Sequence, residues 1–168
     1  MVRGNIMPKA ILICGKICSG KSFYTETLRR KLSAAVLSCD EITLSVFDGN
    51  LGDKHDEICN RIHGYLFGKS VELLEIGVNI ILEWGFWSRA DRDFARQFYE
   101  SRGYECEFHY IVISDDDWQR NIDKRNKEVA EGKTSAYYLD DGLLEKLERL
   151  FEAPDESEID VWFVNSLE

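Results

Sequence analysis

The chain has 168 residues, which is the size of one ordinary domain and too short for two. Hydrophobic residues make up 44% of it, enough to bury a core without disulfides or a structural metal, so disorder is excluded as its main state. Its 31 acidic and 21 basic side chains give a formal net charge of -10, which disfavours a general binder of nucleic acids or anionic lipids. An enzyme that handles phosphate stays possible if its few cations gather locally and a divalent metal assists.

The cysteines and the first residues indicate where the protein works. The cysteines, Cys14, Cys18, Cys39, Cys59 and Cys106, show neither a CxxC pair nor zinc-ligand spacing. An odd count of scattered cysteines fits a reducing compartment, so a cytoplasmic protein is expected. Residues 1–9 lack the apolar run of a signal peptide or membrane span, and we expect a disordered leader there, followed by a single domain over residues 10–168.

The first elements predict a strand, a glycine loop and a helix in direct succession. Ala10–Cys14 is a continuous apolar run bounded by Lys9 and Gly15, as is typical of a strand buried on both faces. Ser22–Leu32 has helical spacing and carries basic residues in its last turn, where cations suit the helix dipole.

The rest of the chain alternates in the same way. Further strands are expected at 34–38, 78–82, 108–113 and 161–164, and helices at 56–76, 89–102, 115–130 and 140–151. Parallel strands need crossovers of a dozen or more residues, so this alternation indicates an α/β fold with a doubly wound, mostly parallel sheet. Residues 131–138 lack a periodic pattern, and a mobile loop is expected there.

The glycine loop carries the most specific motif in the chain. It matches GxxxxGK[ST] and consists of Gly15, Lys16, Ile17, Cys18, Ser19, Gly20, Lys21 and Ser22. The motif lies where its mechanism requires, after a buried strand and at a helix start, so backbone N–H groups can surround a phosphate. Lys21 is then expected to contact the β- and γ-phosphates, and the Ser22 hydroxyl to ligate Mg²⁺.

Two carboxylates follow the neighbouring strands. Asp40 follows the second strand and Glu83 the third. Ligands bind at the carboxyl ends of parallel strands, so both carboxylates should share a rim with the glycine loop. Neighbouring strands are about 4.8 Å apart, which places Glu83 beside the metal and leaves room for an acceptor between Asp40 and the γ-phosphate. A guanine-specificity motif NKxD is absent from the sequence, which argues against a GTPase.

The sequence resembles the small P-loop kinases of nucleoside-monophosphate-kinase type. Within that group it is most similar to the AAA-like branch with chloramphenicol phosphotransferase, zeta toxins and polynucleotide kinase domains. Besides the glycine loop, the resemblance rests on Leu37-Ser-Cys-Asp40, Ile80-Ile-Leu-Glu83, Gly85-Phe86-Trp87-Ser88-Arg89, Arg120-Asn121 and Lys124-Arg125-Asn126. It implies ATP and Mg²⁺ as cofactors. It also implies a three-layer P-loop NTPase fold, whose parallel sheet has the order 2-3-1-4-5 with helices on both faces.

The resemblance also assigns roles to single residues. The aspartate after the second strand accepts the proton of the attacking hydroxyl in this group, which assigns that role to Asp40. Arginines after the fourth strand clamp the phosphates, which implies this role for Arg120 and Arg125, with a lid around residues 124–138. The carboxylate on the metal side is usually aspartate, whereas this chain has Glu83, which is one methylene longer.

Structural roles remain open for the same residues. Asp40 could cap a following helix, because aspartate is favoured at that position. Arg120 and Arg125 could be surface charges paired with nearby carboxylates such as Asp116 or Glu128.

An aromatic cluster beside Glu83 is the candidate acceptor site. Trp84, Phe86 and Trp87 could stack on a planar or sugar-like acceptor, and Arg89 could hold an anionic group on it. A hydrophobic plug beneath the next helix is an equally good interpretation of the tryptophans. His63 is expected to be a buried, hydrogen-bonded histidine rather than a catalyst.

The sequence therefore predicts a phosphotransferase that uses ATP and Mg²⁺ and moves the γ-phosphoryl group to a hydroxyl of a small molecule. Two alternatives stay open, a regulatory ATPase and a nucleic-acid 5′-end kinase, and the acidic composition disfavours the second. Neither a membrane partner nor an oligomeric state is predicted.

Overall fold

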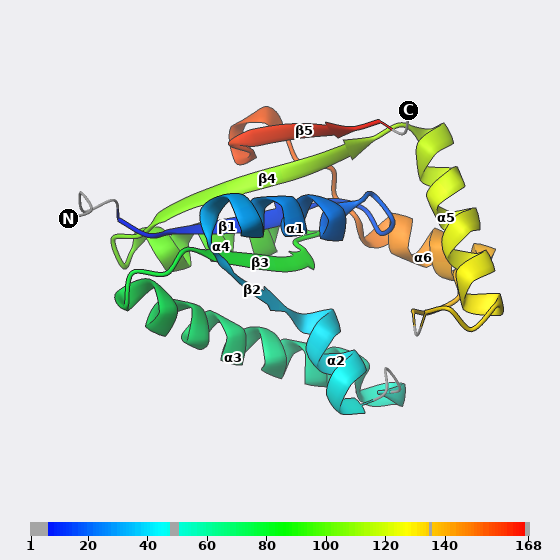
Figure 1. The fold of residues 1–168 in the computed structure, drawn as a ribbon, viewed down its shortest axis with the longest axis horizontal. Coiled ribbons are helices and arrows are strands. Elements are labelled where there is room, and N and C mark those ends of the chain that lie inside the picture. The colour runs from blue at the N-terminus through cyan, green and yellow to red at the C-terminus, as the bar shows by residue number, and fades with distance from the viewer. Residues whose placement is uncertain (1–6, 48–50, 135, 167–168) are drawn as a thin grey trace.

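The computed structural model describes residues 7–47, 51–134 and 136–166. Strands and helices alternate along most of the chain (Figure 1). In order they are β1 (Lys9–Cys14), α1 (Lys21–Leu32), β2 (Ala35–Ser38), α2 (Cys39–Phe47), η1 (Gly52–Lys54), α3 (His55–Glu75), β3 (Ile80–Gly85), α4 (Arg89–Glu100), β4 (Glu105–Ile113), α5 (Asp115–Ala130), α6 (Asp141–Leu150), η2 (Glu156–Glu158) and β5 (Val161–Asn165). Of the leader expected at residues 1–9, residues 1–6 lie outside the described residues, and β1 begins at Lys9, the last residue assigned to that leader.

The described strands form one five-stranded sheet with the order β2-β3-β1-β4-β5. Every neighbouring pair is parallel, which confirms the predicted topology. The register pairs Ser38 of β2 with Glu83 of β3, and Glu83 with Ile13 of β1. The segments after β1 and β2, which carry the glycine loop and Asp40, therefore leave the sheet at the same edge as the end of β3.

The central strand divides the core between the two faces of the sheet. Ala10, Leu12 and Cys14 pack with α3 and α4 on one face, while Ile11 and Ile13 pack with α1 on the other. These five side chains are fully buried, because a central parallel strand is covered on both faces. Figure 1 shows α1 in front of the sheet and α2, α5 and α6 at the end towards which the strands point.

A helix that the sequence analysis did not predict follows β2 without a connecting loop. This helix, α2, spans Cys39–Phe47, so Asp40 lies in its first turn. The hydroxyl of Ser38 accepts a hydrogen bond from the Glu41 amide at 3.3 Å. Ser38 therefore provides a cap contact at the start of this helix, and the side chain of Asp40 lines a cleft.

The third strand is longer than expected and contains an irregularity. Ile13 pairs with Glu83 and Cys14 with Gly85, so Trp84 is an extra residue in the ladder. A bulge of this kind changes the direction of the side chains next to it. Because β3 continues to Gly85, Glu83 lies within the strand, whereas the sequence predicted it directly after the strand.

A buried ion pair anchors α4 behind the end of β3. The Arg92 Nε donates to Glu158 at 2.7 Å, and the two side chains are only 2% and 6% exposed. Arg92 also donates to the carbonyls of Phe86 and Trp87, at 3.0 and 3.1 Å. One buried guanidinium thus holds the segment that leaves β3.

The five cysteines are all free thiols. Among the described residues, the helices are all too short or too polar to cross a membrane.

Candidate active site

Side-chain donors hold five successive carbonyls of the glycine loop. Lys21 and Trp87 donate to Gly15 at 3.1 and 3.2 Å, Lys21 to Lys16 at 2.6 Å, Trp118 to Ile17 at 2.7 Å, Asn121 to Cys18 at 2.9 Å, and Asn165 to Ser19 at 2.8 Å. Carbonyls that point towards these donors leave the N–H side of the loop and the start of α1 to face a ligand. This arrangement suits an anion such as a phosphate.

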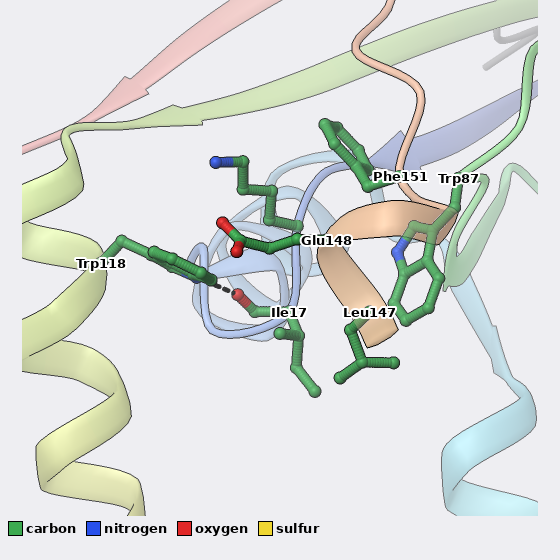
Figure 2. A pocket seen from close by; sticks show the side chains of 7 residues that line it. Ile17, Trp87, Trp118, Leu147, Glu148 and Phe151 are labelled. Atoms are coloured by element: carbon green, nitrogen blue, oxygen red, sulfur yellow. Dashed lines mark hydrogen bonds between the residues drawn. The ribbon is translucent and has the colours of Figure 1, made fainter. Parts of the chain in front are cut away.

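The outer side of the loop is packed rather than open. Figure 2 shows Trp118 of α5 and Trp87 on opposite sides of the loop, with Leu147 and Phe151 from the α6 region between them. The Lys16 ammonium lies 4.8 Å from the centre of the Trp118 ring. The hollow left there measures about 10 Å³, which is space for about one water molecule. These residues support the loop and leave no room for a nucleotide on this side.

Gly20 is required by the close approach of β5 to the loop. Its φ of 96° belongs to the left-handed region that side chains rarely adopt. A Cβ at this position would lie 2.3 Å from Asn165 Nδ2, the donor that holds Ser19. Because Gly20 has no side chain, Asn165 can approach the loop and donate to the Ser19 carbonyl.

Three charged groups meet at the start of α1. Ser22 Oγ donates to Glu83 Oε1 at 2.6 Å. Burial raises the pKa of Glu83, although the hydrogen bond from Ser22 and the charge of Lys21 oppose that rise. Burial lowers the pKa of Lys21, and the charges of Glu83 and Asp40 act in the opposite direction. The structure therefore brings Lys21, Ser22, Glu83 and Asp40 within electrostatic range of one another.

The contact between Ser22 and Glu83 fits a magnesium site. It offers a hydroxyl and a carboxylate oxygen, which are hard ligands that Mg²⁺ prefers. The described part of the chain contains no group of three or more His, Cys, Asp or Glu that could hold a metal by itself. Mg²⁺ is usually bound by one or two protein groups together with substrate phosphates, so this limited ligand set suits a metal that arrives with a nucleotide.

A large cleft connects the glycine loop to α2, α3 and α4. Its volume is about 1520 Å³. Residues singled out from the sequence that line it are Ile17, Cys18, Gly20, Lys21, Ser22, Asp40, His63, Glu83, Trp84, Phe86, Trp87 and Arg125. His63, which was expected to be buried, is only half-buried. Gly15, Lys16, Ser19, Arg89 and Arg120 do not line it. The cleft has room for a nucleotide and a second substrate together.

The two arginines expected to clamp phosphates lie differently. Arg125 lines the cleft and donates to the Cys18 thiol at 3.8 Å and to the Tyr137 carbonyl at 3.1 Å. Arg120 is 63% exposed and forms an ion pair with Asp117 on its own helix. Only Arg125 therefore contacts the loop in this structure, and the role of Arg120 stays a prediction.

Sequence reasoning gave no role to two residues that hold the loop: Trp118 was not named at all, and Asn121 was named only within the motif Arg120-Asn121. Together with Arg125 they are spaced i, i+3 and i+7 along α5, so they lie on one face of that helix. Lys146, which also lines the cleft, was missed, and Lys124, which lines it too, was named only within the motif Lys124-Arg125-Asn126 and given no role. The helical spacing around the predicted Arg125 was the signal that could have identified Trp118 and Asn121.

The aromatic cluster beside Glu83 has mixed roles. Trp84 lines the cleft and stacks on His63, with ring centres 4.5 Å apart. Phe86 reaches the cleft but is only 2% exposed and packs edge-on against Phe108. Trp87 holds the loop, and Arg89 points away to pair with Asp155 at 3.0 Å. Trp84 is thus the member best placed to meet an acceptor.

The chain matches a known protein family. A family profile described as an AAA domain matches residues 11–154. The chain belongs to this family. None of the curated protein sequences compared with it matches.

Solved structures share the same fold over most of this chain. A protein from Chloroflexus aurantiacus, described as a kinase candidate, has a TM-score of 0.71 and 19% identity over 94% of this chain and 87% of its own. The APS kinase CysC of Mycobacterium tuberculosis, solved with AMPPNP and APS, has a TM-score of 0.66 and 17% identity over 96% of this chain and 91% of its own. A chain of the Pnkp1/Rnl/Hen1 RNA repair complex has a TM-score of 0.67 and 20% identity over 86% of this chain but only 44% of its own. Family and fold thus confirm the resemblance to P-loop kinases.

Proposed function

We propose that this protein is a phosphotransferase that uses ATP and Mg²⁺ and transfers the γ-phosphoryl group to a hydroxyl of a small molecule. The observation that carries the proposal is the common cleft of Lys21, Ser22, Glu83, Asp40 and Arg125. Phosphoryl transfer depends mostly on positioning and electrostatic stabilisation, and these residues supply both.

The residues on the loop side of the cleft would bind the phosphates. The Lys21 ammonium, now bonded to the carbonyls of Gly15 and Lys16, has the reach and charge to contact phosphate oxygens. Arg125 lies next to the loop at Cys18 and adds a second positive charge. Ser22 and Glu83 would hold Mg²⁺, which would neutralise charge that develops on the phosphates.

Asp40 is the residue that would accept the proton of the attacking hydroxyl. It starts α2 at the end of β2, two strands from the glycine loop in the sheet order. Glu83 lies on the strand between them and pairs with Ser38, two residues before Asp40, so an acceptor hydroxyl would lie in the cleft between Asp40 and the metal side. A carboxylate in that position orients the hydroxyl and takes its proton as the phosphoryl group is transferred.

The proposal is tested by transfer of labelled γ-phosphate to pooled nucleosides, sugars, antibiotics and oligonucleotides. We expect a labelled product with the wild-type protein. Asp40→Asn should lower turnover by about 10²- to 10⁴-fold while the nucleotide affinity stays the same, because a lost base affects the chemical step.

Glu41→Gln is the matched control. Glu41 is the next residue of the same helix, carries the same charge and does not line the cleft. Its turnover should equal that of the wild type. If Asp40→Asn had the same turnover as the wild type, Asp40 would not be the residue that accepts the proton. Hydrolysis of ATP without any labelled product would favour a regulatory ATPase.

A further inference from the structure

The charged residues that line the cleft are unevenly distributed: among the described residues, every lysine and arginine that lines it lies on one side, which also carries Glu128. The basic residues that line it come from α1, α5 and α6 and are Lys21, Lys124, Arg125 and Lys146. The wall contributed by α2, α3 and α4, here called the acceptor wall, presents the carboxylates Asp40, Asp56 and Asp91. No lysine or arginine of these three helices, all of which lie within the described residues, lines the cleft.

The basic residues of α3 and α4 are paired with carboxylates elsewhere. Arg61 pairs with Glu57 at 3.8 Å, Lys69 with Glu72 at 2.6 Å, Arg89 with Asp155 at 3.0 Å, Arg92 with Glu158 at 2.7 Å, and Arg96 with Asp160 at 2.7 Å. An acceptor with a phosphate, sulfate or carboxylate would therefore meet three carboxylates on this wall and no lysine or arginine, and the histidine His55 on this wall lies 3.1 Å from Asp56.

Aromatic rings complete the acceptor wall. The rings of Trp84 and His63 stack at 18°, and Phe67 meets Trp84 edge-on at a centre distance of 5.5 Å. Phe94 is 57% exposed and also lines the cleft. Aromatic faces next to carboxylates are the combination that attracts an organic cation.

His63 contributes little positive charge to the acceptor wall. Burial lowers its pKa, although the charges of Asp91 and Asp40 act to raise it. His63 is therefore a weaker source of positive charge for this wall than an exposed histidine would be.

We propose that the acceptor is a small hydroxyl compound that carries an amine, of the amino-sugar or amino-alcohol class. Its hydroxyl lies at Asp40, and its ammonium group lies between Asp91 and the face of the exposed Phe94 ring, three residues further along the same helix. This assignment rests on the proposed phosphotransferase function and adds the charge of the acceptor to it.

The first experiment compares three pools of acceptors at equal concentration with ATP, Mg²⁺ and the wild-type protein. The pools hold amino sugars and amino alcohols, neutral sugars and polyols, and sugar acids and sugar phosphates, so that the hydroxyl groups are alike and only the charge differs. Transfer of labelled phosphate should be at least about tenfold greater with the amine pool, since hydrogen bonds to a charged group contribute that much or more to binding.

The outcomes separate the two proposals. Greater transfer to the neutral or the anionic pool overturns the amine assignment and leaves the phosphotransferase function intact. Transfer to none of the pools, with ATP hydrolysis that Asp40→Asn leaves unchanged, overturns the phosphotransferase function and the amine assignment with it.

A matched pair of variants then locates the ammonium group. Asp91→Asn should raise KM for the best amine acceptor by about tenfold and leave kcat and the nucleotide affinity unchanged. Asp93→Asn is the control, because Asp93 lies on the same helix, is 68% exposed and does not line the cleft. An unchanged KM in Asp91→Asn, or an equal rise in Asp93→Asn, overturns the position given to the ammonium group.

Discussion

Gly85 shows how a single residue positions the glycine loop. Its carbonyl accepts a hydrogen bond from the Gly15 amide at 3.2 Å, and its φ of 91° is left-handed. A Cβ at Gly85 would lie 2.4 Å from Trp87 Nε1, the group that donates to the Gly15 carbonyl. The side chain of Trp87 can hold the loop only because residue 85 is a glycine and has no side chain.

We expect Gly85→Ala to destabilise the protein and to weaken nucleotide binding together. The backbone strain costs about 1–3 kcal/mol of unfolding free energy, and displacement of Trp87 releases the Gly15 carbonyl. Urea unfolding and a nucleotide titration measure the two effects.

Gly103→Ala is the control that adds backbone strain without displacing a neighbouring side chain. Gly103 also has a left-handed φ, of 78°, but nothing lies within 4 Å of its Cβ position. It should lose about 1–2 kcal/mol of stability and keep its nucleotide affinity. A Gly85→Ala protein with unchanged nucleotide affinity would show that Trp87 does not position the loop.

Glu83 is the residue whose charge should govern the response to Mg²⁺. Burial raises its pKa, so on acidification it takes up a proton before an ordinary glutamate, whose pKa is about 4.3, and then loses its value as a metal ligand. At limiting Mg²⁺, the rate should therefore fall on the acid side at a pH above that ordinary range.

Glu83→Gln keeps a hydrogen-bond acceptor for Ser22 but removes the charge. The Mg²⁺ concentration needed for half-maximal rate should rise by about 10- to 100-fold, and the acid fall in rate should disappear. A Mg²⁺ titration at several pH values measures both, with Glu41→Gln as the control. Wild-type Mg²⁺ dependence in Glu83→Gln would contradict a metal role for this residue.

At the residue scale, the sequence predicted the groups that belong to a motif or to a strand end. Lys21 and Ser22 are set by the glycine loop, and Glu83 by the rule that strand ends share one rim. The roles of Trp118 and Asn121 were not predicted: the helical spacing around Arg125 could have placed them on the same face of the helix, but it does not show that they bond to loop carbonyls about 100 positions away.

At the element scale, α4 depends on one buried pair. Arg92 and Glu158 are 66 positions apart and bond at 2.7 Å with almost no exposure. Arg92→Met would leave Glu158 as an uncompensated buried charge, at a cost of about 3–5 kcal/mol of unfolding free energy. Arg30→Met, which removes an exposed pair with Glu26, should cost less than about 1 kcal/mol.

The pH dependence of this loss has a definite sign. Burial tends to raise the pKa of Glu158, but the hydrogen bond from Arg92 and the backbone bond at Asp155 hold it below its ordinary value. The wild-type pair therefore stabilises the protein above pH of about 4.3 and loses that contribution as the pH falls through the lower folded pKa.

In Arg92→Met, the hydrogen bond and charge of Arg92 no longer oppose burial, so the pKa of Glu158 rises relative to the wild type even though the Asp155 amide still donates to it, and protonation relieves the buried charge. The difference in stability between wild type and variant should narrow as the pH falls from 7 to about 5. Denaturant unfolding at both pH values measures it, and a difference that widened on acidification would contradict this account.

The helix α2 marks a limit of prediction at the element scale. Its residues, Cys39–Phe47, include β-branched and polar side chains without a strong helical pattern, and β2 runs into it without a turn. Packing decides the conformation here, since α2 lies against α3 and Cys39 and Thr43 are buried. By contrast, the longer amphipathic helices were predicted to within a few residues.

At the scale of the whole molecule, the alternation of apolar strands and helices was sufficient to predict a parallel sheet, and the resemblance supplied the strand order. The division of charge inside the cleft was not visible in the sequence. Arg89 follows the aromatic cluster directly, but the helix it begins turns its arginines towards Asp155, Glu158 and Asp160. Which carboxylate an arginine meets is a property of the tertiary structure.

The net charge leads to a prediction about polyanionic acceptors. The molecule carries a net charge of -10, and the acceptor wall of its cleft presents carboxylates. A nucleic-acid end kinase would need a basic groove, and its affinity would fall by about 10³- to 10⁵-fold between 50 and 200 mM salt if six to ten phosphates were contacted. We expect a 5′-hydroxyl oligonucleotide to be phosphorylated at less than about a tenth of the rate of the best small acceptor, with no such dependence on salt.

Labelled transfer to the oligonucleotide at both salt concentrations, with a matched nucleoside as the control, measures this rate and its dependence on salt. Rapid transfer at 50 mM salt that is abolished at 200 mM would assign the chain to the nucleic-acid kinases instead.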